Sequence, residues 1–441
     1  MLIVSSIGVA FLISNDVKKD DSENAPARIA YTTHAPIAIS GDAGFIVGTN
    51  GVTSGNGSAT NPYIIEGWDI DASTATGISI MTANVHFEIR NCYIHGGVTN
   101  NYSGITTMLC TNATIKNNEL NNMVNSFMDM LSSNIVVQDN IFSPPSMSFG
   151  CMMLLTNEFS ITGNDFLSGA VDIYLFGATN GTLANNDMNE GILMYGRTMS
   201  GISPFCWTTQ NISTSNTVNG KPVYYYKNAP YITINPVGAG QILVGNCTNA
   251  TVKDQNVMDA VIGIEYGFCS NITITDCLLS NNSFGIWGQS SNNSMINWNT
   301  IQNNLGYGLY LENCNYSKVS FNYIAYSSSV AINITQGSWS LISDNTFVDN
   351  NGAGATYDAN HIQTNDNGEN NTWNLNYWSD WQTPDVVPPP GIVDIPYNIS
   401  GTANSKDFSP LTSMPAIPEP AVIVLAIMMI GIFLMVRRKK T

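Results

Sequence analysis

The chain has 441 residues, of which 11% are charged and 44% are apolar, and its formal net charge is −17 at pH 7. This balance excludes nucleic acid as a partner, because binding to phosphates needs Lys and Arg, and no basic stripe precedes the C-terminal tail. Several ordinary domains would fit this length, but a repeat through most of the chain predicts one all-β domain with two tails.

The N-terminal segment, residues 1–30, is expected to direct export. Leu2 to Ser14 is apolar enough for the core of a signal peptide, although no basic leader precedes it and no clear cleavage site follows. Asn15 to Ala30 has the composition of a polar linker. Fourteen Asn-x-Ser/Thr sequons between Asn56 and Asn398 are compatible with a glycosylated surface protein.

A motif of the form apolar-x-x-Asn-x-apolar returns about every 22 residues. Its centres are Cys92, Asn118, Asn140, Asn164, Asn186, Gln255, Cys277, Asn299, Asn322 and Asn345. A fixed short period indicates one small unit stacked many times, and short β-branched segments between Asn, Gly and Ser predict strands and turns. We therefore expect a right-handed, single-stranded parallel β-helix with an N-terminal cap over residues 31–382. Each residue should stack on its counterpart about 4.8 Å along the axis.

The Asn at the centre of the motif is expected at a corner between two inward-facing apolar residues. Asn tolerates positive φ better than most residues, so it can adopt that conformation there. If its side chain turns inward, successive amides should form a hydrogen-bonded ladder along the stack.

The eight cysteines follow the repeat rather than a metal-binding pattern. Cys110, Cys247, Cys269 and Cys314 each lie five residues before the first apolar residue of a motif. This placement favours buried, stacked side chains, with a disulfide between Cys247 and Cys269 as the alternative. No Cys-x-x-Cys occurs and the four His are scattered, so we predict neither a metal site nor a cofactor.

A second periodic set predicts a binding surface. Glu265, Trp287, Tyr310 and Asn333 follow one another at 22, 23 and 23 residues. Because inward apolar residues flank them, we expect them to point outward on one face, where stacked aromatic rings could bind sugar rings. The open alternative is that Trp287 and Tyr310 only shield the sheet or pack under a loop.

Two acidic residues are the weak candidates for catalysis. Asp129 and Asp172 should point outward from equivalent strands two rungs apart, about 9.6 Å along the axis. That separation is at the upper limit for an inverting acid–base pair, which suggests a polysaccharide lyase or glycoside hydrolase. No Lys or Arg repeats beside them, so two solvated acids are the favoured interpretation.

The C-terminal segment, residues 416–441, has the pattern of a membrane span. Ala421 to Val436 is apolar, and Arg437 to Lys440 is entirely basic, which predicts a short transmembrane helix with the body of the protein outside the cell. Pro418-Glu419-Pro420 precedes it, and the three-part pattern resembles the sorting signals read by exosortase and archaeosortase systems. That resemblance implies removal of the apolar span. Residues 383–415 are expected to be irregular.

Several stretches resemble the NosD-type β-helix family, often labelled periplasmic copper-binding. They are residues 54–58, 61–68, 219–226, 239–244 and 376–381. The resemblance implies the β-helix fold and includes no fixed catalytic motif. Residues 383–390 lack the Asp-rich pattern of relatives, so no calcium site is expected.

The resemblance also suggests copper as a ligand. Met123, Met128, Met130, Met152 and Met153 are possible thioether ligands, but we expect them to fill the core. The sequence thus predicts an exported, membrane-anchored β-helix that binds surface glycans or polysaccharide, or has a structural role in the envelope. A polysaccharide-degrading enzyme is the first alternative, and a copper-handling accessory protein is the second.

Overall fold

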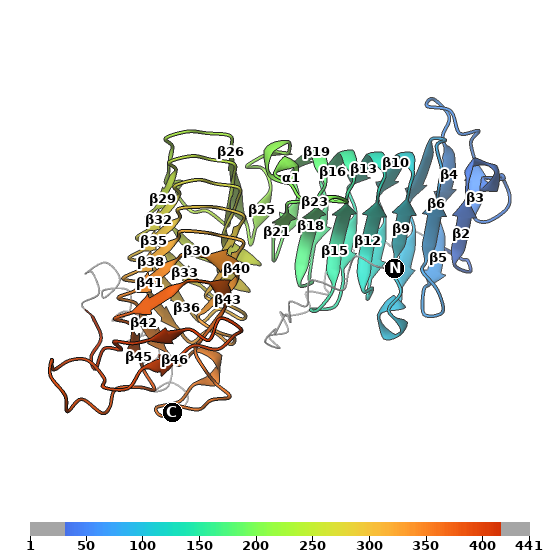
Figure 1. Cartoon of the computed structure of the whole chain (residues 1–441). Helices are drawn as coiled ribbons and strands as arrows, with labels where there is room; N and C mark the ends of the chain where they lie inside the picture. Colours follow the sequence, from blue (N-terminus) through green and yellow to red (C-terminus); the bar gives the residue numbers. More distant parts are fainter. Residues whose placement is uncertain (1–30, 416–441) are drawn as a thin grey trace, which may run out of the picture. The chain divides into compact units, whose positions relative to one another are not determined.

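The computed structural model describes residues 31–415, which form two compact units. The first unit comprises residues 31–227, 240–245 and 259–265, and the second comprises 228–239, 246–258 and 266–415. In each unit the strands form stacked coils (Figure 1). The predicted signal peptide and the C-terminal span lie outside the described residues. Between residues 31 and 415 no helix is long and apolar enough to cross a membrane.

Three parallel sheets form the first unit. In hydrogen-bonded order, one contains β24 (Asn211–Ile212), β19 (Thr179–Ala184), β16 (Asn157–Thr162), β13 (Ser133–Gln138), β10 (Thr111–Lys116), β7 (Phe87–Arg90), β4 (Tyr63–Glu66) and β3 (Val52–Ser54). The second contains β2 (Ile37–Ser40), β6 (Ile78–Met81), β9 (Ile105–Met108), β12 (Asn125–Met130), β15 (Phe149–Leu154), β18 (Val171–Phe176) and β21 (Ile192–Tyr195). The third contains β1 (Thr32–Thr33), β5 (Trp68–Asp71), β8 (Tyr93–His95), β11 (Glu119–Asn121), β14 (Ile141–Ser143), β17 (Asp165–Phe166), β20 (Asp187–Met188), β25 (Thr217–Val218), β26 (Lys221–Lys227) and β28 (Gln241–Gly245).

Short elements interrupt these coils. β3–β4 and β25–β26 pair antiparallel, as do β22 (Arg197–Thr198) and β23 (Gly201–Ile202). The helical turns are η2 (Asp42–Gly44), η3 (Gly97–Asn100), α1 (Phe205–Thr208) and, in the second unit, η4 (Asn350–Gly352). β31 (Ile262–Gly267) contributes residues to both units.

The second unit is built in the same way. One set of strands is β27 (Thr233–Ile234), β29 (Thr251–Lys253), β32 (Thr273–Thr275), β35 (Met295–Asn297), β38 (Lys318–Ser320), β41 (Leu341–Ser343), β44 (Thr372–Asn374), β47 (Lys406–Asp407) and β46 (Tyr397–Asn398). Another is β30 (Asn256–Met258), β33 (Leu278–Ser280), β36 (Thr300–Gln302), β39 (Tyr323–Ala325), β42 (Thr346–Val348) and β45 (Tyr377–Trp378). The third is β34 (Phe284–Gln289), β37 (Leu309–Glu312), β40 (Ile332–Ser338) and β43 (Thr364–Glu369).

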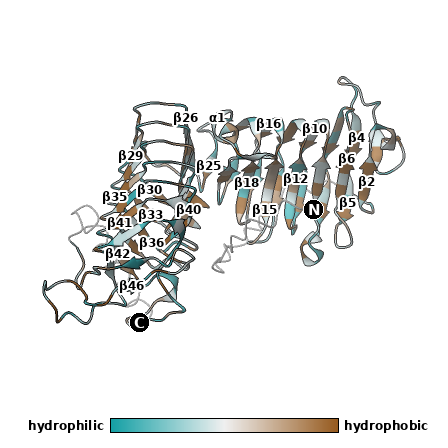
Figure 2. Ribbon diagram, viewed as in Figure 1, coloured by the Kyte–Doolittle hydropathy of each residue, from teal (hydrophilic) through white to brown (hydrophobic). Residues whose placement is uncertain are grey.

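The predicted parallel β-helix is confirmed by the strand register. In the first unit the inward position of successive strands is apolar at each level and completely buried, as at Ile89, Ile115, Val137, Ile161 and Leu183. Hydrophobic residues lie mainly on the strands of both units (Figure 2). The core therefore runs along the inside of each stack, where burial of apolar side chains stabilises every level.

The predicted asparagine ladder is also confirmed. In the first unit each side-chain Nδ2 donates to Oδ1 of the next residue at 2.7–3.0 Å, from Asn118 through Asn140, Asn164 and Asn186 to Asn216. In the second unit the same bonds, at 3.0 Å, join Asn299, Asn322, Asn345 and Asn376, and Asp407 accepts the last one. Asp407 lies in the segment predicted to be irregular, where β46 and β47 close the second unit.

The ladder residues do not adopt the positive φ that an Asn at the corner allows. The residue before each motif centre adopts positive φ instead, as at Asn117 (φ 53°) and Trp298 (φ 57°). The left-handed residue makes the corner, and this leaves the following Asn free to turn its amide inward, where it satisfies buried backbone carbonyls such as that of Ile89.

All eight cysteines are buried free thiols, which confirms the stacking interpretation. Cys247 and Cys269 lie on neighbouring levels, and the backbone N–H of Cys247 donates to Sγ of Cys269 at 3.4 Å. A hydrogen bond between the two side chains, distinct from this backbone contact, lowers the pKa of Cys247 to about 7.

Candidate functional site

The predicted outward column exists in the second unit. Trp287 on β34 pairs with Tyr310 on β37, Tyr310 with Asn333 on β40, and Asn333 with Asn365 on β43. Their strand neighbours Ile286, Leu309 and Ile332 are completely buried on the opposite side. The column therefore lies on the outer face of four consecutive strands, and we call it the aromatic–amide column.

The aromatic end of the column is a packed cluster of rings. The Trp287 and Tyr310 rings meet edge to face with their centroids 4.9 Å apart. Phe284 lies 5.1 Å from Trp287, and Tyr307 is stacked 5.6 Å from Tyr310. Trp287 is only 3% exposed as a result, so its predicted role as an exposed platform was wrong. Tyr310 remains partly exposed.

The environment of Tyr310 is polar on one side. Burial of the ring is the main cause that raises the pKa of Tyr310 to about 12, and the nearby charge of Glu312 adds to it. Glu312 belongs to a second outward column, in which it pairs with Gln289 and Thr335. A ligand on this face would thus meet one phenol and one carboxylate side by side.

The amide end of the column is hydrogen-bonded along the stack. Asn365 Nδ2 donates to Asn333 Oδ1 at 2.7 Å, and Ser400 Oγ donates to Asn365 Oδ1 at 3.1 Å. Two residues further along β43, Asn367 Oδ1 accepts the backbone N–H of Thr402 at 2.9 Å. These bonds hold the outer side chains of β43 in place and connect them to the segment around Thr402.

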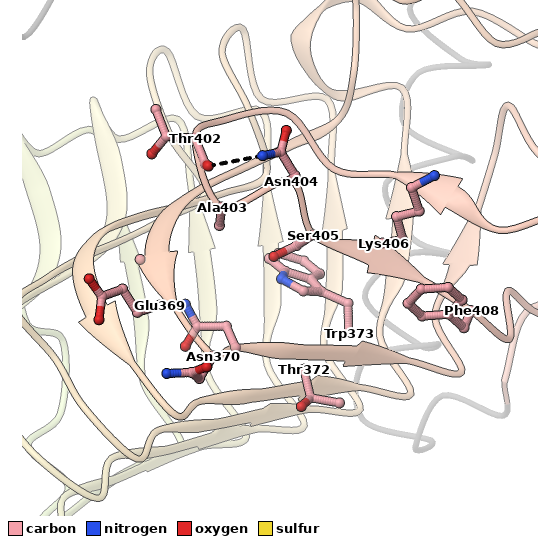
Figure 3. A pocket seen from close by; sticks show the side chains of 12 residues that line it. Glu369, Asn370, Thr372, Trp373, Thr402, Ala403, Asn404, Ser405, Lys406 and Phe408 are labelled. Carbon is pink, nitrogen blue, oxygen red and sulfur yellow. Dashed lines mark hydrogen bonds between the residues drawn. The ribbon is translucent and has the colours of Figure 1, made fainter.

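A cavity of about 600 Å³ adjoins this end of the face. Figure 3 shows residues 369–373 opposite residues 402–408, with the Trp373 indole between them. Buried Asp366 joins both walls, since it accepts from Trp373 Nε1 at 3.0 Å and from Ser405 Oγ at 2.8 Å. Phe408 is 70% exposed at the rim. The repeat does not indicate this cavity, because residues 402–408 lie outside the repeat and fold back on the last coil.

Glu265, the predicted start of the outward set, is completely buried in the first unit, so its predicted orientation was wrong. Its Oε1 accepts the backbone N–H of Met194 at 3.0 Å, and Gln241 Oε1 accepts that of Ile192 at 2.9 Å. Both donors belong to β21, the last strand of its sheet. The two side chains therefore satisfy the free edge of β21, and burial raises the pKa of Glu265 well above its usual range.

The predicted outward orientation of Asp129 was also wrong. Asp129 is buried, and it accepts hydrogen bonds from the hydroxyls of Thr107, at 2.5 Å, and Thr156. Burial raises the pKa of its carboxyl. The side chain therefore has a structural role inside the coil.

Asp172 is buried as well, and its Oδ2 accepts the backbone N–H groups of Glu190 at 2.6 Å and Gly191 at 2.8 Å. Asp172 and Asp129 do not hold equivalent positions in their strands. Asp129 pairs with Met153, and Met153 pairs with Leu175, which lies three residues after Asp172 in the chain. Neither acid reaches the surface, so the pair does not form an acid–base site in this structure.

A second groove, of about 480 Å³, lies on the first unit. Tyr93, His95 and Asn121 line it, and His95 Nε2 lies 3.0 Å from Asp69 Oδ1. The Tyr93 ring stacks on His95 at 4.8 Å. Sequence reasoning missed this group because it considered His only as a metal ligand. The signal was present, since Asp69 and Tyr93 hold the same outward position one level apart.

The methionines divide between the inside and the outside of the coils. Met123 and Met153 are completely buried, as predicted for core filling. Met128 and Met130 are half-buried on the outer face of β12, so that prediction was wrong for them. In residues 31–415 no group of three or more His, Cys, Asp or Glu side chains is placed to hold a metal ion.

Solved structures similar to this chain include proteins with 10–14% sequence identity. The A-module of the Azotobacter vinelandii mannuronan C-5 epimerase AlgE6 has 12% identity, with 71% of this chain and 87% of that chain covered and a TM-score of 0.29. The catalytic domain of a GH87 α-1,3-glucanase has 14% identity, covers 70% and 57%, and gives a TM-score of 0.29. The Dettilon tailspike protein has 12% identity, covers 69% and 60%, and gives 0.27. With TM-scores this low, these similarities support no statement about activity.

No curated protein matches the chain. A family model described as "Periplasmic copper-binding protein (NosD)" matches residues 36–200 and 206–399. These ranges cover nearly all of the described coils, and they include the strands of both units. The chain belongs to the NosD family.

Proposed function

We propose that this protein is an exported glycan-binding protein that holds a polysaccharide along the outer face of β34, β37, β40 and β43. The observation that supports it best is the aromatic–amide column, in which partly exposed Tyr310 is followed on successive levels by Asn333, which is 8% exposed, and by half-buried Asn365. Levels about 4.8 Å apart present a regular series of contacts, which suits a polymer of repeating units. The family's description as periplasmic, together with the sequons, supports export.

The face favours binding by ring stacking and hydrogen bonds. Aromatic rings beside amide and hydroxyl groups are a combination that recognises the apolar faces and the hydroxyls of sugars. The cavity beside Trp373 and Phe408 extends this surface past β43 and could accept the end or a branch of the polymer. A role in binding is favoured over catalysis because the two acids proposed for turnover are buried.

The charges on this face indicate a neutral glycan. The four strands contain no Lys or Arg, whereas Glu312 lies beside Tyr310. An acidic polysaccharide would meet this carboxylate without a cation to offset the repulsion. We therefore expect neutral polymers to bind better than polymers of uronic acids.

A glycan array with the full-length protein tests the proposal, followed by titration of the best neutral and acidic polymers. Tyr310→Ala should weaken binding about fivefold, which corresponds to the loss of roughly 1 kcal/mol from one aromatic contact. Tyr316→Ala is the matched control, because Tyr316 is 59% exposed at a corner outside the column. Equal binding by the two variants, or stronger binding to acidic polymers, would contradict the proposal.

A further inference from the structure

Three methionines stack on the outer face of the first unit. Met81 on β6 pairs with Met108 on β9, and Met108 pairs with Met130 on β12. The next residue in the column is Leu154, and Ser40 precedes it. The column therefore contains an uninterrupted run of three thioethers on neighbouring parallel strands.

The three side chains point out of the coil. Ile80, Thr107 and Asp129, which precede them in the chain, are completely buried on the inner side. Met81 is 39% exposed, and Met108 and Met130 are half-buried. Solvent, or a metal donor, can therefore reach the run at its Met81 end.

The backbone fixes the three methionines in equivalent positions. Each is the last residue before a left-handed corner, formed by Thr82 (φ 57°), Leu109 (φ 54°) and Leu131 (φ 56°). The same corner at each level directs the three Cβ atoms the same way. Neighbouring levels are about 4.8 Å apart. The side chains of Met81 and Met130 therefore have to bend by only one level to reach a metal ion bound to Met108, and Met has the rotatable bonds to do so.

The chemistry of this cluster selects a soft monovalent cation. Thioethers are uncharged, polarisable ligands that favour Cu(I) over hard cations such as Mg²⁺ or Ca²⁺. The outward positions of β6, β9 and β12 contain no charged residue, so a divalent cation would find nothing to neutralise it. Met128 and Met152 form a pair in the next outward column and add thioethers to the same face.

The geometry points to a Cu(I) site formed by Met81, Met108 and Met130. The family description names copper, but it assigns no residue, and this chain has no His or Cys cluster in residues 31–415 that could take its place. The three thioethers fit the monovalent ion. This site lies on the first unit and is independent of the proposed glycan surface on the second.

Binding of Ag(I), an air-stable analogue, and of Cu(I) under anaerobic conditions tests this inference. Full-length protein is titrated in competition with a chromophoric Cu(I) chelator, and native mass spectrometry gives the stoichiometry. We expect one ion per chain and a loss of affinity of at least about tenfold in Met108→Leu, because the central ligand is removed. Leu conserves the volume of Met, so circular dichroism should show an unchanged fold.

Two comparisons make the test specific. Met147→Leu should bind like the wild type, because Met147 is 69% exposed and lies outside the column. A triple variant with Met81, Met108 and Met130 all changed to Leu should lose the site. Failure of the wild type to bind either ion would overturn the proposal. Unchanged binding by the triple variant would overturn it too, since it would show that the ion binds to other residues.

Discussion

Tyr310 covers Trp287: their rings meet edge to face at 4.9 Å, and Trp287 is 3% exposed whereas Tyr310 is partly open to solvent. The two residues of one predicted set therefore have different roles. Trp287 belongs to a packed cluster that supports the surface, and Tyr310 forms the surface itself.

Substitution of these two residues should separate stability from binding. Trp287→Ala removes a buried ring and should lower the free energy of unfolding by about 3–5 kcal/mol. Tyr310→Ala should cost less stability, because its ring is partly exposed, and should mainly weaken glycan binding. Urea unfolding and glycan titration of both variants measure the difference. Equal losses of stability would show that Tyr310 is also only a packing residue.

The asparagine ladder should be a main source of stability. Asn140→Ala removes the acceptor for the backbone N–H and the amide of Asn118, and it leaves the carbonyl of Ile115 without its donor. Several buried polar groups lose partners together, so the free energy of unfolding should fall by about 2–4 kcal/mol. Asn125→Ala is the control, because half-exposed Asn125 donates one bond of 3.3 Å to Ser103, and it should cost less than about 1 kcal/mol. Similar losses in the two variants would contradict this role for the ladder.

The repeat predicted the coils and the ladder because each position of the motif recurs on many levels. Asn118, Asn140 and Asn164 share one environment, so their common amide and flanking apolar residues identify it without knowledge of distant contacts. The same argument placed Trp287, Tyr310 and Asn333 in one column correctly.

Prediction failed for residues whose surroundings do not recur from level to level. Glu265 was added to the column by spacing alone, but it satisfies the edge of β21, an arrangement created by the end of a sheet. Asp172 was aligned with Asp129 although the register separates them by three residues. The exposure of Trp287 was overestimated because Phe284, which packs on it, and Tyr307, which packs on Phe284, belong to loop and strand positions that the motif does not describe.

The topology of the chain in the membrane stays a prediction, because residues 416–441 lie outside the described part. We expect the β-helix outside the cell, with Arg437 to Lys440 inside it or removed with the sorting segment. Protease added to intact cells should degrade the body of the protein. A tag after Lys440 should be protected, or absent from the mature form. Protection of the body itself would show the opposite orientation.

Asp129→Asn and Asp172→Asn should leave glycan binding unchanged, since both carboxyls are buried in the first unit and the proposed surface lies on the second. The substitutions also test the enzyme alternative. Each variant is compared with the wild type in a screen for polysaccharide cleavage, with circular dichroism as the control for folding. Loss of a cleavage activity in a folded Asp variant would place the protein among the polysaccharide-degrading enzymes.

Stability should depend on pH through Glu265. Its pKa in the folded protein is raised well above the usual value by burial, so the folded state holds this proton more tightly than the unfolded chain does. The stability that the proton contributes is complete below the unfolded pKa of about 4.3, and it is lost as pH rises toward the folded pKa. Glu265→Gln keeps an oxygen that can accept the N–H of Met194 but does not ionise. The variant and the wild type should therefore unfold at similar urea concentrations near pH 4, and the variant should become the more stable of the two as pH rises. A constant difference between them from pH 4 to pH 8 would show that Glu265 does not titrate on unfolding.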